Sequence, residues 1–158
     1  LIIQHYETAI SAIPALVAFI PMLMDTGGNS GSQSSVTVIR AISLGELEFS
    51  DLPRVIGKEV LTAGLCGAVL ALACFGKIML VDRLLLGNTD VTALVAAVVC
   101  ITMVLTVIIA KFIGCSLPML AKRLGFDPAV MASPFITTIV DALSLLIYMN
   151  VAKMLLGI

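Results

Sequence analysis

The sequence is poor in charged and aromatic residues. Charged residues make up 12% of the 158 residues, aromatic residues make up 5%, and tryptophan is absent. The formal net charge is −1, and no basic run stands beside aromatic residues. A nucleic-acid-binding surface needs clustered positive charge, often with aromatic side chains on which bases stack. The composition therefore excludes nucleic acid as a partner.

Cysteine and histidine, the usual ligands of transition metals, are also scarce. The four cysteines lie in apolar runs without a close cysteine or histidine neighbour: Cys66, Cys74, Cys100 and Cys115. The one histidine, His5, is isolated. Transition-metal sites need such ligands in close pairs or clusters. We interpret the cysteines as small core residues and His5 as a solvated surface residue.

Hydrophobic residues, in contrast, are abundant. They make up 60% of the chain, and the mean hydropathy is +1.17. Four apolar segments reach or exceed the roughly 20 residues that a helix needs to cross a bilayer: residues 8–42, 55–81, 91–120 and 129–158. We therefore predict an all-α, polytopic membrane domain with about four transmembrane helices, located in a cell membrane and surrounded by lipid.

A polar stretch interrupts the first segment. Residues 21–33 combine a proline, a carboxylate, amides, hydroxyls and three glycines. Irregular polar backbone at membrane depth is tolerated only where it is buried in protein or lines a water-filled cavity. We predict that the first helix is broken near residues 21–31, and that the break borders a passage for a solute.

The connections between segments carry two further signals. Ser50, Asp51 and Pro53 predict a helix start, and Asp127 with Pro128 repeats the pattern before the last segment. The connections near residues 42–54 and 121–128 also hold more lysine and arginine than the connection between segments two and three. By the positive-inside rule, these two connections are predicted to be cytoplasmic.

Three ionisable residues lie well inside the predicted spans, away from their ends: Asp25, Lys111 and Asp141. A charge at mid-membrane costs roughly 2.5 to 3.5 kcal/mol, so each needs a reason. Asp141 lies near the middle of the last segment, and polar or helix-breaking residues share its helix face: Pro134, Thr137, Thr138, Ser144 and Tyr148. This face predicts a wet lining for a cation. The alternative is that Asp141 is buried against Lys111.

The other two ionisable residues have different interpretations. Lys111 is interpreted as structural, with a side chain long enough to reach the cytoplasmic interface. Asp25 has two interpretations of equal weight. It either points into the same cavity as Asp141 or caps the broken helix through the amides of residues 27–29.

The available ligand atoms indicate the kind of ion. Carboxylate, amide, hydroxyl and carbonyl oxygens suit a hard cation, whereas thiolate and imidazole ligands are lacking. Magnesium gives up its water reluctantly, so proteins commonly hold the hydrated ion through a few carboxylates. The site predicted around Asp141 fits magnesium or another divalent cation.

The order of these motifs resembles a known family. The matching residues are Pro21, Asp25-Thr26-Gly27-Gly28-Asn29, Gly31, Gln33-Ser34, the region of Arg40, Asp127-Pro128-Ala129, Ser133-Pro134, Thr137-Thr138, Asp141 and Leu146-Ile147-Tyr148. Together they resemble the transmembrane domain of MgtE-type magnesium channels and their eukaryotic solute-carrier relatives, over essentially the whole chain. The resemblance implies a homodimer with five helices per protomer, an ion pore along the dimer interface, and a central aspartate that binds hydrated magnesium.

The resemblance assigns roles to individual residues. Asp141 matches the central aspartate, and Thr137, Ser133 and Asn29 are candidates for contacting the water shell of the ion, with Asp25 as a further candidate. Some family members have asparagine where this chain has Ser133, so selectivity is expected to differ. The chain itself is expected to be one transmembrane ion-conducting domain over residues 1–158. The first family helix and the cytosolic regulatory domains of the full-length protein are expected to lie outside it.

Three other functions are compatible with individual features of the sequence. The Asp25-Thr26-Gly27 triplet occurs in aspartic proteases, and Asp141 would then complete a carboxylate pair. The sequence around Asp141 lacks the context that intramembrane aspartyl proteases require, so we expect no enzyme. A proton-coupled secondary transporter of another cation would use Asp141 as a proton relay. A scaffold subunit would transport nothing.

Overall fold

The computed structural model describes residues 3, 6, 11, 13–131 and 133–157. Within these ranges the regular structure is entirely helical, and no strand occurs. The all-α prediction is therefore confirmed for the described part of the chain. His5 and residues 8–10 and 12, where the first segment was predicted to begin, lie outside it.

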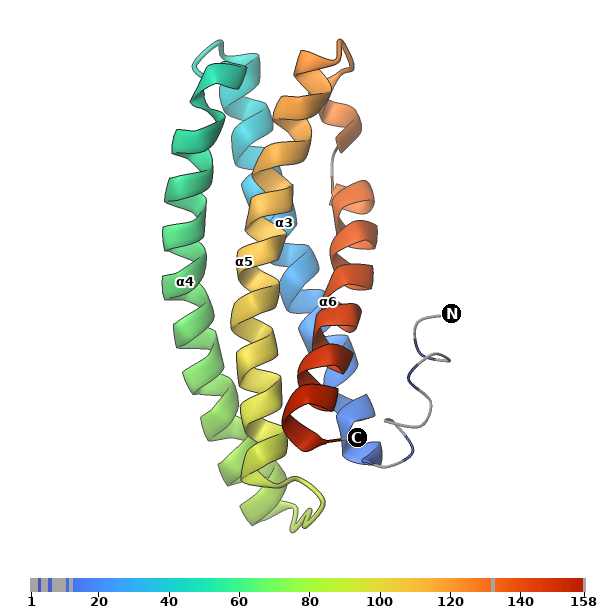
Figure 1. Ribbon diagram of the computed structural model, residues 1–158. Helices are drawn as coiled ribbons and strands as arrows, with labels where there is room; N and C mark the ends of the chain where they lie inside the picture. The colour runs from blue at the N-terminus through green and yellow to red at the C-terminus, as the bar shows by residue number, and fades with distance from the viewer. Residues whose placement is uncertain (1–2, 4–5, 7–10, 12, 132, 158) are drawn as a thin grey trace.

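Four long helices alternate in direction and lie side by side (Figure 1). They are α3 (Ile20–Ser43), α4 (Leu52–Lys77), α5 (Ala93–Arg123) and α6 (Ser133–Leu156). Three short 3-10 helices precede α3, α4 and α6, namely η1 (Pro14–Phe19), η2 (Phe49–Asp51) and η4 (Pro128–Met131), and a π-helix, η3 (Ile78–Leu85), continues α4. The α3–α4 and α5–α6 connections lie at the same end of the bundle, the upper end in Figure 1.

The helix boundaries follow local capping chemistry. The Asp51 carboxylate accepts a hydrogen bond from the Glu48 amide at 3.0 Å, and the Asp127 carboxylate accepts one from the Ala129 amide at 2.9 Å. Helical turns thus begin at both predicted places, as η2 ahead of α4 and as η4 ahead of α6, although the Asp51 side chain makes no capping hydrogen bond to α4 itself. Within the described residues, positive φ angles occur only at the glycines that end helices: Gly45, Gly87, Gly125 and Gly157. Glycine is favoured there because a side chain disfavours the left-handed backbone that ends a helix.

The predicted break in the first helix is wrong. α3 runs without interruption from Ile20 to Ser43, and its three internal glycines keep helical backbone angles. The reason lies in the neighbouring helices. A Cβ atom at Gly27 would lie 2.6 Å from Thr106 Cγ2, and one at Gly31 would lie 3.0 Å from the Ala110 carbonyl oxygen. The glycines therefore let α3 pack closely against its neighbours, while the α-helix keeps its own backbone groups paired, as hydrocarbon requires.

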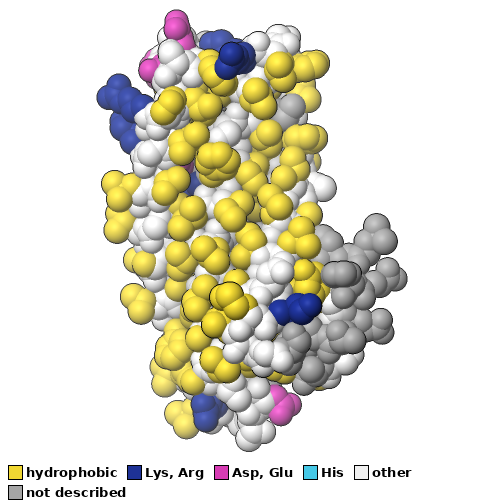
Figure 2. Space-filling model, viewed as in Figure 1, with side chains coloured by type: hydrophobic (Ala, Val, Ile, Leu, Met, Phe, Trp, Pro, Cys, Tyr) yellow, Lys and Arg dark blue, Asp and Glu magenta, His cyan; other side chains and the backbone are white. Residues whose placement is uncertain are grey.

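The helices differ in how they meet the membrane. In the described residues, three helical stretches are long and apolar enough to cross a bilayer: Phe49–Leu85, Ala93–Arg123 and Pro134–Leu156. α3 has 24 residues, which is also long enough, but its middle is polar. It packs against both α5 and α6, which shield its glycine face from lipid. Figure 2 shows a largely hydrophobic middle, with most charged side chains near the two ends.

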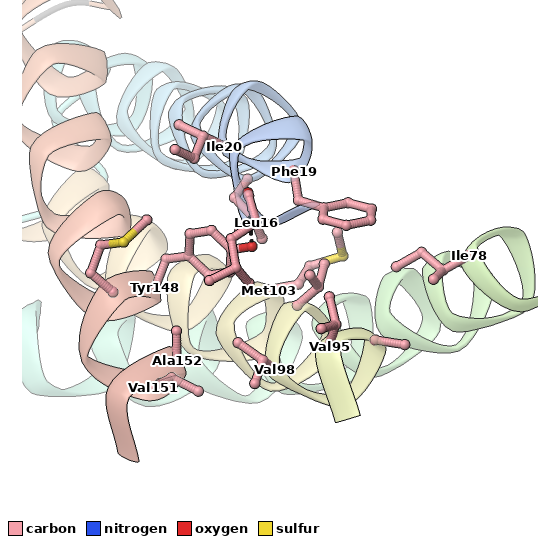
Figure 3. Close-up of a cluster of buried hydrophobic side chains, with 14 of the residues drawn as sticks. Leu16, Phe19, Ile20, Ile78, Val95, Val98, Met103, Tyr148, Val151 and Ala152 are labelled. Atoms are coloured by element: carbon pink, nitrogen blue, oxygen red, sulfur yellow. Dashed lines mark hydrogen bonds between the residues drawn. The ribbon is translucent and has the colours of Figure 1, made fainter. Parts of the chain in front are cut away.

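The largest apolar core joins α3, α5 and α6 in the half of the bundle that holds the start of α3. Leu16 and Phe19 of η1 lie there with Val95, Val98 and Met103 of α5 (Figure 3). α4 packs mainly on α5, and many of its large apolar residues are exposed, including Leu61, Leu65 and Leu72. α5 is thus the central helix, and α4 is the helix most open to lipid.

Candidate cation site

The candidate site lies where α3 passes α6. A Cβ atom built on Gly28 would lie 3.1 Å from Thr137 Cγ2 and 3.4 Å from Asp141 Oδ1. The bare backbone of α3 at Gly28 therefore sits directly against these two side chains. Both are partly exposed. The structure thus brings Thr137 and Asp141 together beside the glycine motif, as the sequence predicted.

The carboxylate of Asp25 belongs to the same region. It lies close enough to Asp141 for the two charges to interact. Because α3 is unbroken, Asp25 has no broken helix end to cap, and this second interpretation of Asp25 is wrong. Two carboxylates from two helices therefore lie near Gly28, Asp141 beside it and Asp25 one turn before it on α3. Repulsion between them favours a bound cation there.

Asn29 lies one turn beyond Asp25 and is exposed. Both residues line a groove of about 720 Å³ between α3 and α4. Thr26, Ser30 and Gln33 of α3, and Lys111 of α5, line it too. Gln33 continues the four-residue spacing that begins with Asp25 and Asn29, and this spacing was the signal that could have singled it out from the sequence.

The hydroxyl groups of the site are arranged as acceptors. Thr26 donates its hydroxyl proton to the Met22 carbonyl at 2.8 Å, and Ser30 donates to the Thr26 carbonyl at 2.8 Å. Thr137 donates to the Pro134 carbonyl at 3.1 Å. Each proton is used within its own helix, so the oxygen lone pairs remain available. Water molecules around a metal ion act as hydrogen-bond donors, and such oxygens can receive them.

Asp141 has no ion-pair partner in the part of the chain that the structure describes. Lys111, the predicted rival partner, instead donates to Glu59 Oε2 of α4 at 3.0 Å. The interpretation of Asp141 as a carboxylate buried against Lys111 is therefore wrong. Lys111 does not extend to the interface either, because its side chain is only 12% exposed. Glu59 was missed from the sequence because it lies near the predicted edge of a span.

The polar face predicted on α6 is only partly correct. Ser144 is buried and donates to the Val140 carbonyl at 2.7 Å. Tyr148 is buried in the apolar core and donates to the Leu16 carbonyl at 3.0 Å (Figure 3). These two residues face α3 and the core, because α3 packs across that side of α6. Pro134 and Thr138, in contrast, are exposed.

Ser133 is the remaining predicted site residue on α6. Ser133 begins α6, but its side chain lies outside the described structure.

Of the cysteines, Cys74 and Cys115 are buried as predicted, and Cys100 is partly buried. Cys66 is exposed and lines the groove between α3 and α4, so its assignment to the core is wrong.

The described residues contain no group of three or more histidine, cysteine, aspartate or glutamate side chains that could hold a metal ion. The described part of the chain therefore offers two carboxylates and several neutral oxygens rather than a closed ligand cage. This arrangement suits an ion that keeps much of its water shell, as magnesium does.

Together, the apolar helices and the unpaired carboxylates define an integral membrane protein with an intramembrane polar site. The chain belongs to the MgtE family, described as divalent cation transporters, whose pattern matches residues 20–151. It is 37% identical over 155 residues, or 98% of its length, to the magnesium transporter MgtE of Thermus thermophilus. It is 37% identical to the protein of the same name from Enterococcus faecalis over 97% of its length, and 38% identical to that of Bacillus subtilis over 96%.

The family membership settles the class of protein. The chain spans about a third of the length of these curated relatives, 32% in each case.

The family is one of transporters, and the Asp25-Thr26-Gly27 triplet lies inside α3. A pepsin-like protease would place this triplet in a β fold. The aspartic-protease alternative is therefore wrong.

Proposed function

We propose that this domain conducts magnesium across the membrane, through a passage lined by α3 and α6. The observation that carries the proposal is the pair of carboxylates, Asp141 beside Gly28 and Asp25 one turn before it on α3, neither of which has an ion-pair partner among the described residues. A charge at membrane depth needs compensation, and a cation passing the site supplies it. The relatives named as magnesium transporters support magnesium as the ion.

Each residue of the proposed site has a distinct role. Asp141 is the central ion-binding carboxylate, and Asp25 adds a second negative charge from α3. Thr137 and Asn29 accept hydrogen bonds from the water shell of the ion, and Ser133 does so from the first turn of α6. Because magnesium loses its inner water slowly, these contacts act through water rather than by direct coordination.

The passage is completed by a second copy of the chain. Asp25, Asn29 and Gln33 are exposed along α3, and Thr138 is exposed on α6. Such polar side chains are costly against lipid tails, so another surface must cover them. In a two-fold dimer each copy covers the polar face of the other, and two Asp141 residues face one axis. Residues 1–158 then form the transmembrane ion-conducting part, while a further helix and cytosolic regulatory domains stay expectations of the family resemblance.

The substitution Asp141→Asn tests this proposal. Asparagine keeps the shape of the side chain but removes its charge. At an effective dielectric constant near 20, a unit charge about 4 Å from another is worth about 4 kcal/mol, so losing it weakens binding of a divalent ion by several kcal/mol. We expect magnesium flux into liposomes to fall at least a hundredfold, without a change in folding or expression.

The matched control is Asn150→Asp, because Asn150 lies on the same helix but donates to Tyr6 and to the Leu146 carbonyl, away from the site. This variant should leave the magnesium dependence of flux unchanged. Flux should also persist without a proton gradient, which distinguishes a channel from a proton-coupled transporter. Wild-type flux through the Asp141→Asn variant would overturn the assignment.

A further inference from the structure

A second charged cluster lies inside the bundle, apart from Asp141. Lys111 of α5 donates to Glu59 Oε2 of α4 at 3.0 Å and to Ser34 Oγ of α3 at 3.1 Å. The Ser34 hydroxyl also donates to Glu59 Oε2. Ser34 is buried, and the side chains of Lys111 and Glu59 are 12% and 21% exposed. Three helices thus meet at one ion pair.

The cluster borders the groove between α3 and α4, which holds two of the proposed ion-contacting residues, Asp25 and Asn29, but not Asp141. Lys111 lines this groove together with Asp25, Asn29 and Gln33. A lysine ammonium in the same groove as Asp25 and Asn29 disfavours a divalent cation at these two residues, because like charges repel strongly where water is scarce. The position is therefore compatible with cation passage only if the charge of Lys111 is compensated.

We propose that Glu59 sets the affinity for magnesium, because it neutralises Lys111 at the wall of the groove. The pair then contributes no net charge, and the negative charge of Asp25 dominates the groove. Ser34 holds both partners in place through its two hydrogen bonds. This inference rests on the proposed function, and it adds a residue that acts through Lys111 rather than by touching the ion.

A purely structural ion pair makes a different prediction. Breaking a buried pair from either side destabilises a protein, because the remaining charge is left uncompensated. If the pair only fastened helices together, removing Glu59 or Lys111 would affect transport in the same direction. If it sets the charge of the groove, the two removals act in opposite directions on magnesium affinity. The sign of the effect therefore separates the two roles.

The test measures the magnesium concentration that gives half-maximal flux in liposomes for Glu59→Gln, Lys111→Gln and the double variant. Glu59→Gln leaves a bare ammonium, so this concentration should rise about tenfold. Lys111→Gln leaves the Glu59 carboxylate, to which Ser34 still donates a hydrogen bond. The magnesium concentration for half-maximal flux should therefore fall severalfold. The double variant, with no net change of charge, should return to within about twofold of the wild type.

Thermal stability in detergent is measured in parallel, because Glu59→Gln risks poor folding. If Glu59→Gln does not fold, the result for Lys111→Gln decides between the two roles. Loss of a purely structural ion pair is not expected to tighten magnesium binding. Equal or weaker affinity in Lys111→Gln overturns the inference. Asp141→Asn is included as a separate arm. If Asp141→Asn abolishes flux but both pair variants weaken magnesium binding, only this inference fails; if Asp141→Asn conducts normally, the proposed function fails first.

Discussion

At the scale of single residues, Asp141 and Tyr148 show how two polar side chains on one helix differ in role. They lie seven residues apart, and about two helical turns place them on nearly the same side. Asp141 is partly exposed beside Gly28, whereas Tyr148 is buried and donates to the Leu16 carbonyl. The proposed function assigns ion binding to Asp141. Tyr148 instead donates a hydrogen bond to a backbone carbonyl group at the start of the bundle.

This difference leads to a prediction for Tyr148→Phe. The substitution keeps the ring in the core but leaves the Leu16 carbonyl without its hydrogen bond, which costs about 1–3 kcal/mol. We expect a lower melting temperature in detergent, and an unchanged magnesium concentration for half-maximal flux. A variant of wild-type stability with impaired magnesium affinity would instead place Tyr148 in the passage.

The sequence revealed the important residue types but not their surroundings. Asp141 and Thr137 were predicted together because their spacing of four residues holds in any helix. The same rule added Ser144 and Tyr148 to that face, and only the packing of α3 across α6 shows that they are buried. The Lys111–Glu59 pair joins residues 52 positions apart, and no local pattern predicts such a contact.

At the scale of helices, the close approach of α3 and α5 depends on paired glycines. A Cβ atom at Gly114 of α5 would overlap the carbonyl oxygen of Gly31 on α3. Because that oxygen belongs to the backbone, it cannot move aside as a flexible side chain would. The two helices are therefore in contact through their backbones, as small residues often allow in membranes.

We expect Gly114→Ala to destabilise the protein by about 1–3 kcal/mol, as overpacking of a tight contact typically does. The matched control is Gly64→Ala on α4, where an added Cβ atom would meet no atom within 4 Å. Thermal unfolding in detergent compares the two variants. Equal melting temperatures for both would show that the α3–α5 contact is looser than the structure indicates.

The bounds of the long helices were largely predictable, whereas the continuity of α3 was not. Hydrophobic runs and capping residues are local signals, and they placed the helix starts near Leu52 and Ser133 within a few residues. Glycine can either end a helix or let a neighbouring helix pack closely against it. It ends α3 at Gly45, but at Gly31 it allows a neighbouring helix to approach. Only the partner helix distinguishes these cases.

At the scale of the whole molecule, the exposed polar faces of α3 and α6 require a covering surface. The dimer proposal predicts that residues on the open face of α6 approach their copies across the axis. Thr138 is exposed, whereas Ser144 is buried within one protomer. In a background that lacks Cys66, Cys74, Cys100 and Cys115, Thr138→Cys should form an intermolecular disulfide in membranes, which requires Cα atoms about 4.4–6.8 Å apart.

Ser144→Cys serves as the control, because its thiol is enclosed by α3 and should not cross-link. The two variants are compared by the fraction of dimer on non-reducing gels. Cross-linking at Ser144 but not at Thr138 would mean that the polar face of α6 is turned away from the partner. A monomeric mass together with full transport would mean that the passage lies within one chain.

The most direct test of the central claim is to locate the ion. Manganese, which scatters X-rays anomalously, would be diffused into crystals of the transmembrane domain. We predict one anomalous peak between two Asp141 carboxylates on the dimer axis, about 4 Å from their oxygens because a water layer intervenes, and removed by excess magnesium. A peak elsewhere, with none beside Asp141 in a transport-competent protein, would contradict the account.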